Sequence, residues 1–241
     1  MKCLRHNGRP AIVLVLVLLA GACGGLASAA AQVQLELAAG CNGAALPSFS
    51  LTGLGDALVV SLEAAVGEEL LFRGPLLWGL AAMIPWLARK NMPLARALVR
   101  RWGPHGAAVF AVAVSALLFG IAHLLPSPET PLPALSPAVA VQAMLKVVEG
   151  TAFGSLMGSL VVNSRWFAAR DGAILRSLGF PMLLHAAFDL LYFAPTLGLG
   201  LPLPDTYLTG NVLDELGMAA STLLLILAVF VAARSKKARS C

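Results

Sequence analysis

The sequence predicts an all-α, polytopic transmembrane helix bundle of about five core helices, preceded by an N-terminal signal peptide or signal anchor. Hydrophobic residues make up 59% of the 241 residues and charged residues only 12%, whereas soluble domains have about 45–50% and about 25%. The mean hydropathy is +0.83. The apolar runs are long and rich in Ala, Leu, Gly and Val, which favours helices over the short alternating strands of a membrane barrel.

Residues 1–31 are typical of a signal peptide or a signal anchor. A basic start precedes an apolar run from Ala11 to Ala22, and Ala27-Ser28-Ala29 follows as a small-residue cleavage pattern. The apolar run also extends through Ala31, as in an anchor that is not cleaved. Residues 32–55 contain Gly, Asn, Pro and Ser but no Lys or Arg, which predicts a non-cytoplasmic linker.

Residues 56–234 are predicted to form one transmembrane domain, and residues 235–241 a basic tail. The first core stretch is longer than the roughly 20 residues that a bilayer core requires, and Gly74 and Pro75 predict a kink or break within it. The five predicted core spans are residues 57–88, 106–125, 134–162, 173–195 and 216–233.

Basic residues alternate with the spans instead of forming one patch. Loops 89–101 and 163–172 and the C-terminus are basic, whereas residues 196–213 contain no Lys or Arg. The positive-inside rule therefore places the basic segments on one cytosol-like side. The basic residues behind the net charge of +5 are therefore interpreted as determinants of membrane topology. The sequence has no basic face interleaved with aromatic residues that would indicate nucleic-acid binding.

Ionisable residues interrupt three of the apolar segments. Glu68-Glu69-Leu-Leu-Phe-Arg73 lies in the first core span, Phe119-Gly-Ile-Ala-His123 in the second, and His185-Ala-Ala-Phe-Asp189 in the fourth. A charge at mid-membrane costs roughly 2.5–3.5 kcal/mol on insertion scales. We therefore expect these side chains to meet in the bundle interior as one polar site.

Helical spacing divides the roles of the two glutamates. Glu69 and Arg73 are four residues apart, so they share a helix face and can form an ion pair. Glu68 points roughly 100° away, which leaves it free to take a proton as a general base or acid. The alternative is a Glu–Glu–Arg cluster that only braces the bundle.

His185 and Asp189 also share a helix face. Asp189 either orients His185 or, when protonated, donates with it to an oxyanion. A divalent metal such as zinc is a further alternative, with Glu68, His123 and His185 as its ligands. The chain has no HExxH motif and no cysteine pair at metal-type spacing, so no cofactor is assigned.

Two features of the span at 134–162 have structural interpretations. Lys146 and Glu149 are three residues apart and are expected to pair with each other. Gly150, Gly154 and Gly158 recur at every fourth residue, which lets a neighbouring helix approach closely.

The three motifs, in this order on successive apolar segments, resemble the CPBP family. These are the CAAX prenyl-protease and bacteriocin-processing intramembrane proteases, also called the Abi family. The resemblance covers about residues 57–195 and implies that residues 56–234 are a protease domain. It implies hydrolysis of a peptide bond in a membrane-associated substrate, a membrane-embedded or lipidated protein or peptide.

The resemblance also implies roles for the motif residues. The residue that matches Glu68 activates a water molecule, and the one that matches His123 helps to hold it. Those that match His185 and Asp189 stabilise the tetrahedral oxyanion, while Glu69 and Arg73 support the site. The family has also been described as metalloendopeptidases, which keeps the metal alternative open.

Two departures and two other functions accompany this hypothesis. Asp189 replaces the asparagine of prenyl-protein members, and the charge-based topology places His123 near the non-cytosolic end of its span, away from a cytosolic substrate. A catalytically inactive scaffold or regulator of the same family is one alternative. A small proton-coupled transporter is the other, because intramembrane carboxylates and histidines also relay protons.

Overall fold

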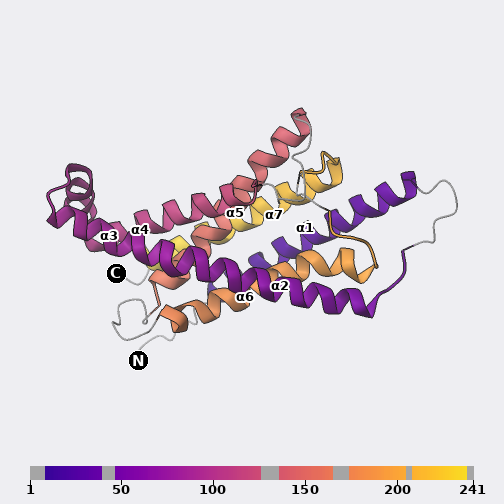
Figure 1. Ribbon diagram of the computed structural model, residues 1–241, viewed down its shortest axis with the longest axis horizontal. Helices are drawn as coiled ribbons and strands as arrows, with labels where there is room; N and C mark the ends of the chain where they lie inside the picture. The colour runs from indigo at the N-terminus through magenta and orange to yellow at the C-terminus, as the bar shows by residue number, and fades with distance from the viewer. Residues whose placement is uncertain (1–8, 40–46, 126–135, 165–173, 205–207, 238–241) are drawn as a thin grey trace, which may run out of the picture.

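The protein is a bundle of long helices in a computed structural model that describes residues 9–39, 47–125, 136–164, 174–204 and 208–237. These residues contain helices and no strand, so the predicted all-α class is confirmed. Figure 1 shows the helices side by side along one long axis. In chain order they are α1 (Arg9–Ala39), α2 (Leu51–Leu71), the π-helix η1 (Phe72–Leu76), α3 (Leu77–Arg89), α4 (Pro93–Ala122), α5 (Pro137–Val162), α6 (Ile174–Gly198) and α7 (Val212–Lys237).

The chain is a multi-pass integral membrane protein. Five helical runs in its described part are long and apolar enough to cross a membrane: Pro10–Ala38, Leu51–Arg89, Pro137–Val162, Leu175–Gly198 and Val212–Arg234. Helix α4 makes a sixth if its two arms, which meet at 116°, count as one span. Each predicted core span therefore contains a helix, and α1 is the additional one.

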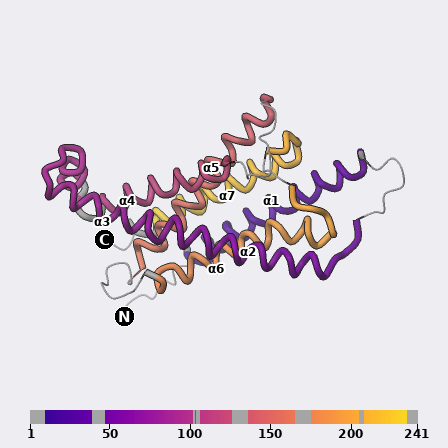
Figure 2. The backbone as a smooth tube through the Cα atoms, viewed as in Figure 1, coloured from indigo at the N-terminus to yellow at the C-terminus, as the bar shows by residue number. Residues whose placement is uncertain are grey.

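The ends of the bundle agree with the predicted charge pattern. Figures 1 and 2 show the start of α1, the end of α3 and the end of α7 toward one end of the bundle, while the end of α1 and the start of α2 lie at the other end. Arg89, the last residue of α3, thus lies at the same end as the basic residues that close α7. This arrangement is the one that the positive-inside rule predicts.

The long span Leu51–Arg89 is broken where the sequence predicts a break. Pro75 has no backbone N–H and cannot continue the α-helical hydrogen bonds. The chain responds with the π-helical turn η1, in which Gly74 has a non-helical ψ of −108°. The hydroxyl of Ser115 donates to the Phe72 carbonyl at 2.8 Å and so ties the break to α4. Such π-turns are frequent at functional sites.

Glycines bring α4 and α5 into close contact, as the four-residue glycine repeat predicts. A methyl group added at Gly150 would place its carbon 2.8 Å from the Gly120 Cα, and one added at Gly154 would lie 3.0 Å from the Ala116 Cα. Real side chains do not approach a backbone so closely. The two helices can therefore pack at this distance only without side chains at these positions.

Replacing Gly150 by Ala should separate α4 from α5 and lower stability by about 1–3 kcal/mol, the usual effect of overpacking. Gly79→Ala is the matched control, because an added methyl group at Gly79 meets no atom within 4 Å and alanine favours helix. Thermal unfolding of both variants in detergent micelles measures the difference. Equal midpoints would contradict the close-packing explanation.

Helix α1 is part of the same bundle core. Val17 and Ala20 are fully buried in one hydrophobic cluster with Phe153 and Phe188. A methyl group added at Gly21 would lie 2.6 Å from the Phe188 carbonyl oxygen, so α1 and α6 are in backbone contact.

Helix α1 also runs without interruption through the small-residue pattern at Ala27–Ala29. We therefore propose that α1 is retained as an anchor. Helices also cover both ends of the predicted 32–55 linker, since α1 ends at Ala39 and α2 begins at Leu51.

Candidate active site

The structure brings the ionisable residues of the three motifs into one cluster. The Oε2 atom of Glu68 lies 3.6 Å from His185 Nε2 and 3.9 Å from His123 Nε2. His185 Nε2 lies 3.4 Å from an Asp189 carboxylate oxygen. Residues from α2, α4 and α6 therefore surround one point, although 117 positions separate Glu68 from His185 in the sequence.

Glu69 is the centre of the supporting contacts. Its side chain is 0% exposed, and one carboxylate oxygen lies 3.3 Å from Arg73 Nε, which confirms the predicted ion pair. The other oxygen is hydrogen-bonded to His185 Nδ1 at 2.9 Å. An ionised Glu69 accepts this bond from Nδ1–H, so Glu69 orients His185 and directs Nε2 toward Glu68.

Asp189 lies at the ring nitrogen of His185 that Glu69 does not contact. It faces Nε2 of His185 at 3.4 Å, on the same side as Glu68, while Glu69 holds the opposite ring nitrogen. Because Glu69 already holds Nδ1 of His185, the second role that the sequence left open for Asp189, donation to an oxyanion, is compatible with this geometry.

Phe119 forms the apolar floor of the cluster. The Arg73 guanidinium carbon lies 4.3 Å from its ring centroid, a cation–π contact, and the His123 ring packs edge-on at 4.6 Å. The Phe119 carbonyl is hydrogen-bonded to His123 Nδ1 at 2.8 Å, which leaves Nε2 of His123 directed toward Glu68. The FxxxH spacing thus supplies both the floor and the orientation of the histidine.

A cavity of about 30 Å³ adjoins the cluster, which exceeds the roughly 10–15 Å³ that one water molecule needs. His123, His185 and Asp189 line it. The Oε2 atom of Glu68 is buried and accepts no hydrogen bond from the protein, although 35% of the whole side chain is exposed. The site thus combines a carboxylate oxygen, two imidazoles and room for water.

Most of the cluster is buried within the bundle, and Glu68 is its most exposed member. His123 follows the last residue of α4, near the non-cytosolic end that the charge-based topology assigns to this span. It nevertheless lies beside His185, which is near the middle of α6. Helix α4 therefore ends beside the middle of α6 and not beside one of its ends.

Lys146 and Glu149 also line this cavity, a position that the sequence did not indicate. Their predicted pairing is confirmed, since Lys146 Nζ lies 3.0 Å from Glu149 Oε2. Lys146, Glu149, Gly150 and Phe153 occur at three- and four-residue spacing, and so share one face of α5. The spacing predicts that these side chains share one environment. Only the packing of α5 against α4 and α6 shows that this environment is the cavity beside the cluster.

The donor geometry gives no support to the metal alternative. In the part of the chain that the structure describes, no group of three or more His, Cys, Asp or Glu side chains is placed to hold a metal ion.

A comparison with known protein families matches most of this chain. The family described as type II CAAX prenyl endopeptidase Rce1-like matches residues 50–191, which include all three motifs and more than half of the chain. No curated protein and no solved structure matched. The matched segment begins next to the start of α2 and ends two residues after Asp189, so it contains every residue of the cluster. The chain therefore belongs to the type II CAAX prenyl endopeptidase Rce1-like family.

Proposed function

We propose that this protein is an intramembrane endopeptidase that hydrolyses a peptide bond of a membrane-associated substrate. The observation that carries the proposal is the convergence of Glu68 with His123 and His185 beside a water-sized cavity. Family membership supports a CAAX-type endopeptidase at the level of the reaction class. The site within a bundle of membrane-spanning helices supports a substrate that the bilayer delivers.

In the proposed reaction, Glu68 is the general base. A water molecule held between Glu68 and His123 loses a proton to the free carboxylate oxygen as its own oxygen attacks the scissile carbonyl carbon. A new C–O bond forms and the carbonyl oxygen becomes an oxyanion. When the C–N bond breaks, Glu68 returns the proton to the leaving amine, so protons and electrons balance over the cycle.

His185 and Asp189 are the proposed oxyanion donors. His185 can donate from Nε2 while Nδ1–H is held by Glu69 only in its doubly protonated form, so the negative charge of Glu69 is part of the mechanism. Asp189 donates when it carries a proton, as a neutral carboxylic acid does in other oxyanion sites. Loss of one such donor typically costs about 10²–10³ in rate.

The activity is tested with the purified full-length protein in liposomes. The probe is a peptide that ends in a farnesylated CAAX sequence, and the same peptide without the farnesyl group shows whether the lipid is required. Mass spectrometry of the products should show cleavage after the modified cysteine. No cleavage of either peptide, by protein whose helical content is intact, would count against the proposal.

Asp189→Asn should retain cleavage within about tenfold of wild type, because an amide donates a hydrogen bond as a protonated carboxyl does. Asp189→Leu has similar size and no donor, and should lose at least about a hundredfold. Initial rates on the farnesylated peptide distinguish the two. An Asn variant as inactive as the Leu variant would show that the site requires the carboxylate charge.

A further inference from the structure

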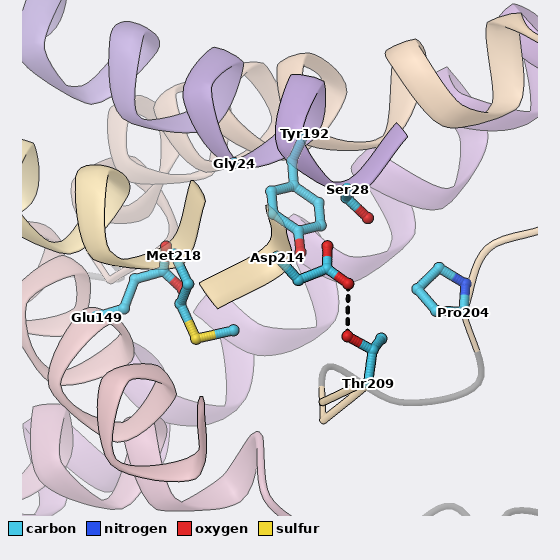
Figure 3. Close-up of a pocket in the computed structure, with 8 residues that line it drawn as sticks. All are labelled: Gly24, Ser28, Glu149, Tyr192, Pro204, Thr209, Asp214 and Met218. Carbon is cyan, nitrogen blue, oxygen red and sulfur yellow. Dashed lines mark hydrogen bonds between the residues drawn. The ribbon is translucent and has the colours of Figure 1, made fainter. Parts of the chain in front are cut away.

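A second polar cavity lies between α1, α5, α6 and α7, outside the catalytic cluster. Its volume is about 10 Å³, close to that of one water molecule. Figure 3 shows the side chains of Ser28, Tyr192, Thr209 and Asp214 converging on it, with Glu149 on the opposite wall. These five residues come from separate parts of the chain, and all of them carry hydroxyl or carboxylate oxygens.

The hydrogen bonds in this cavity are incomplete. The Thr209 hydroxyl donates to Asp214 at 2.6 Å, and Lys146 bonds one oxygen of Glu149. The other oxygen of Glu149, Oε1, is buried and has no hydrogen-bond partner. Bulk solvent does not supply one either, because the residue is only 3% exposed. An unpaired buried oxygen costs about 1–3 kcal/mol, and internal water is the usual partner of such groups.

Glu149 and Tyr192 line this cavity and also the cavity beside the catalytic cluster. The two cavities therefore share part of their walls. Lys146 stands on the catalytic side of this boundary, with its Nζ 5.6 Å from the Tyr192 ring centroid. Acidic side chains therefore line both cavities, with Asp214 in one, Asp189 in the other and Glu149 in both.

Residues that connect α6 and α7 bound the second cavity on one side. Pro204 and Thr209, which line it, belong to the segment between α6 and α7. Gln142 of α5 anchors that segment: its Nε2 donates to the Asn211 carbonyl at 3.2 Å, and its Oε1 accepts from Gly210 N–H at 2.7 Å. Figure 1 shows this end of the bundle opposite the end of α3, where Arg89 lies.

We propose that the two cavities form one passage that supplies water to the catalytic cluster from the side of the α6–α7 segment, with Glu149 and Tyr192 between them. The proposal rests on the proposed hydrolytic function, because each cleavage consumes a water molecule that must cross an apolar bundle. It also requires that α1 is retained, because Ser28 forms part of the wall. The passage is separate from the exposed edge of Glu68, where a lipid-borne substrate would approach.

The first test measures whether small solutes reach both cavities. The four native cysteines, Cys3, Cys23, Cys41 and Cys241, are first replaced by Ser. Single thiols are then introduced as Ser28→Cys in the second cavity (the outer cavity) and as Phe193→Cys in the cavity beside the catalytic cluster (the catalytic cavity). The control is Ser61→Cys on α2, because Ser61 is 0% exposed and lines neither cavity. The probe is the silver ion, which is small enough to follow water and reacts with thiols.

Silver should modify the Ser28→Cys and Phe193→Cys thiols at least tenfold faster than the Ser61→Cys thiol. The unreacted thiol is counted with a maleimide after denaturation. If either reporter reacts as slowly as Ser61→Cys, the passage does not exist. These rates do not depend on peptide cleavage, so they decide the passage even if the wild-type protein cleaves no peptide and the proposed function fails.

The second test asks whether the passage serves the reaction. Silver bound to Ser28→Cys should block the outer cavity and lower the cleavage rate at least tenfold, and excess mercaptoethanol should restore it. The cysteine-free protein treated in the same way should keep its rate. Cleavage that continues at the full rate while the Ser28→Cys thiol is occupied would overturn the proposal.

Discussion

Glu68→Gln is expected to lower the cleavage rate by at least about a hundredfold while the bundle remains folded. The amide has nearly the same shape as the carboxylate, but it cannot take a proton from water, and general-base groups contribute about 10²–10⁴ in rate. The substitution should not disturb packing, because the Glu68 side chain is 35% exposed and its contacts with the histidines are 3.6 and 3.9 Å long.

The measurement is the initial rate of cleavage of the farnesylated peptide, with circular dichroism and thermal unfolding to verify the fold. Glu63→Gln is the matched control, since Glu63 is an exposed carboxylate on the same helix, and its rate should be unchanged. A Glu68→Gln protein that cleaves within threefold of wild type would remove Glu68 from the role of base.

Glu69→Leu is expected to destabilise the protein by about 3–5 kcal/mol and to abolish cleavage. The substitution leaves Arg73, which is 1% exposed, as a buried charge without its carboxylate, and broken buried ion pairs cost about this much. The Nη1 and Nη2 atoms of Arg73 have no hydrogen-bond partner, so the guanidinium has little to compensate for the loss. His185 also loses the bond that orients it.

The double variant Glu69→Leu, Arg73→Met separates these two effects. Replacing both members of a buried pair by apolar residues is often neutral or stabilising, so thermal stability in micelles should return close to that of wild type. Cleavage should not return, because His185 Nδ1 still has no carboxylate partner. Recovery of both properties would show that Glu69 only neutralises Arg73 and has no positioning role for His185.

Local spacing was enough to predict the features that one helix contains. The four-residue interval between Glu69 and Arg73 predicts their ion pair, the pair Gly74-Pro75 predicts the broken span, and the glycine repeat of α5 predicts a close helix contact. Each of these depends on helix geometry and backbone chemistry alone, and the structure contains all three.

Contacts between helices that are distant in the sequence do not follow from spacing within one helix. The bond between Glu69 and His185 joins positions 116 residues apart. Helical spacing indicates only Asp189 as a partner that orients His185. The spacing of Lys146 and Glu149 predicts a structural pair, because it does not show that α5 borders the cavity beside the cluster. The N-terminal segment likewise matched a removable signal peptide, although α1 packs in the core beside α6.

The sequence by itself determined that the chain crosses a membrane as helices, and which ionisable side chains must leave the lipid. Both conclusions follow from transfer energies, because apolar runs of this length are stable in a bilayer and isolated charges are not. Only the tertiary structure decided which of those side chains share a site, which carboxylate holds Nδ1 of His185, and which residues line the cavity beside it. These depend on the order in which the helices pack around one another, and a helix face does not specify its neighbour.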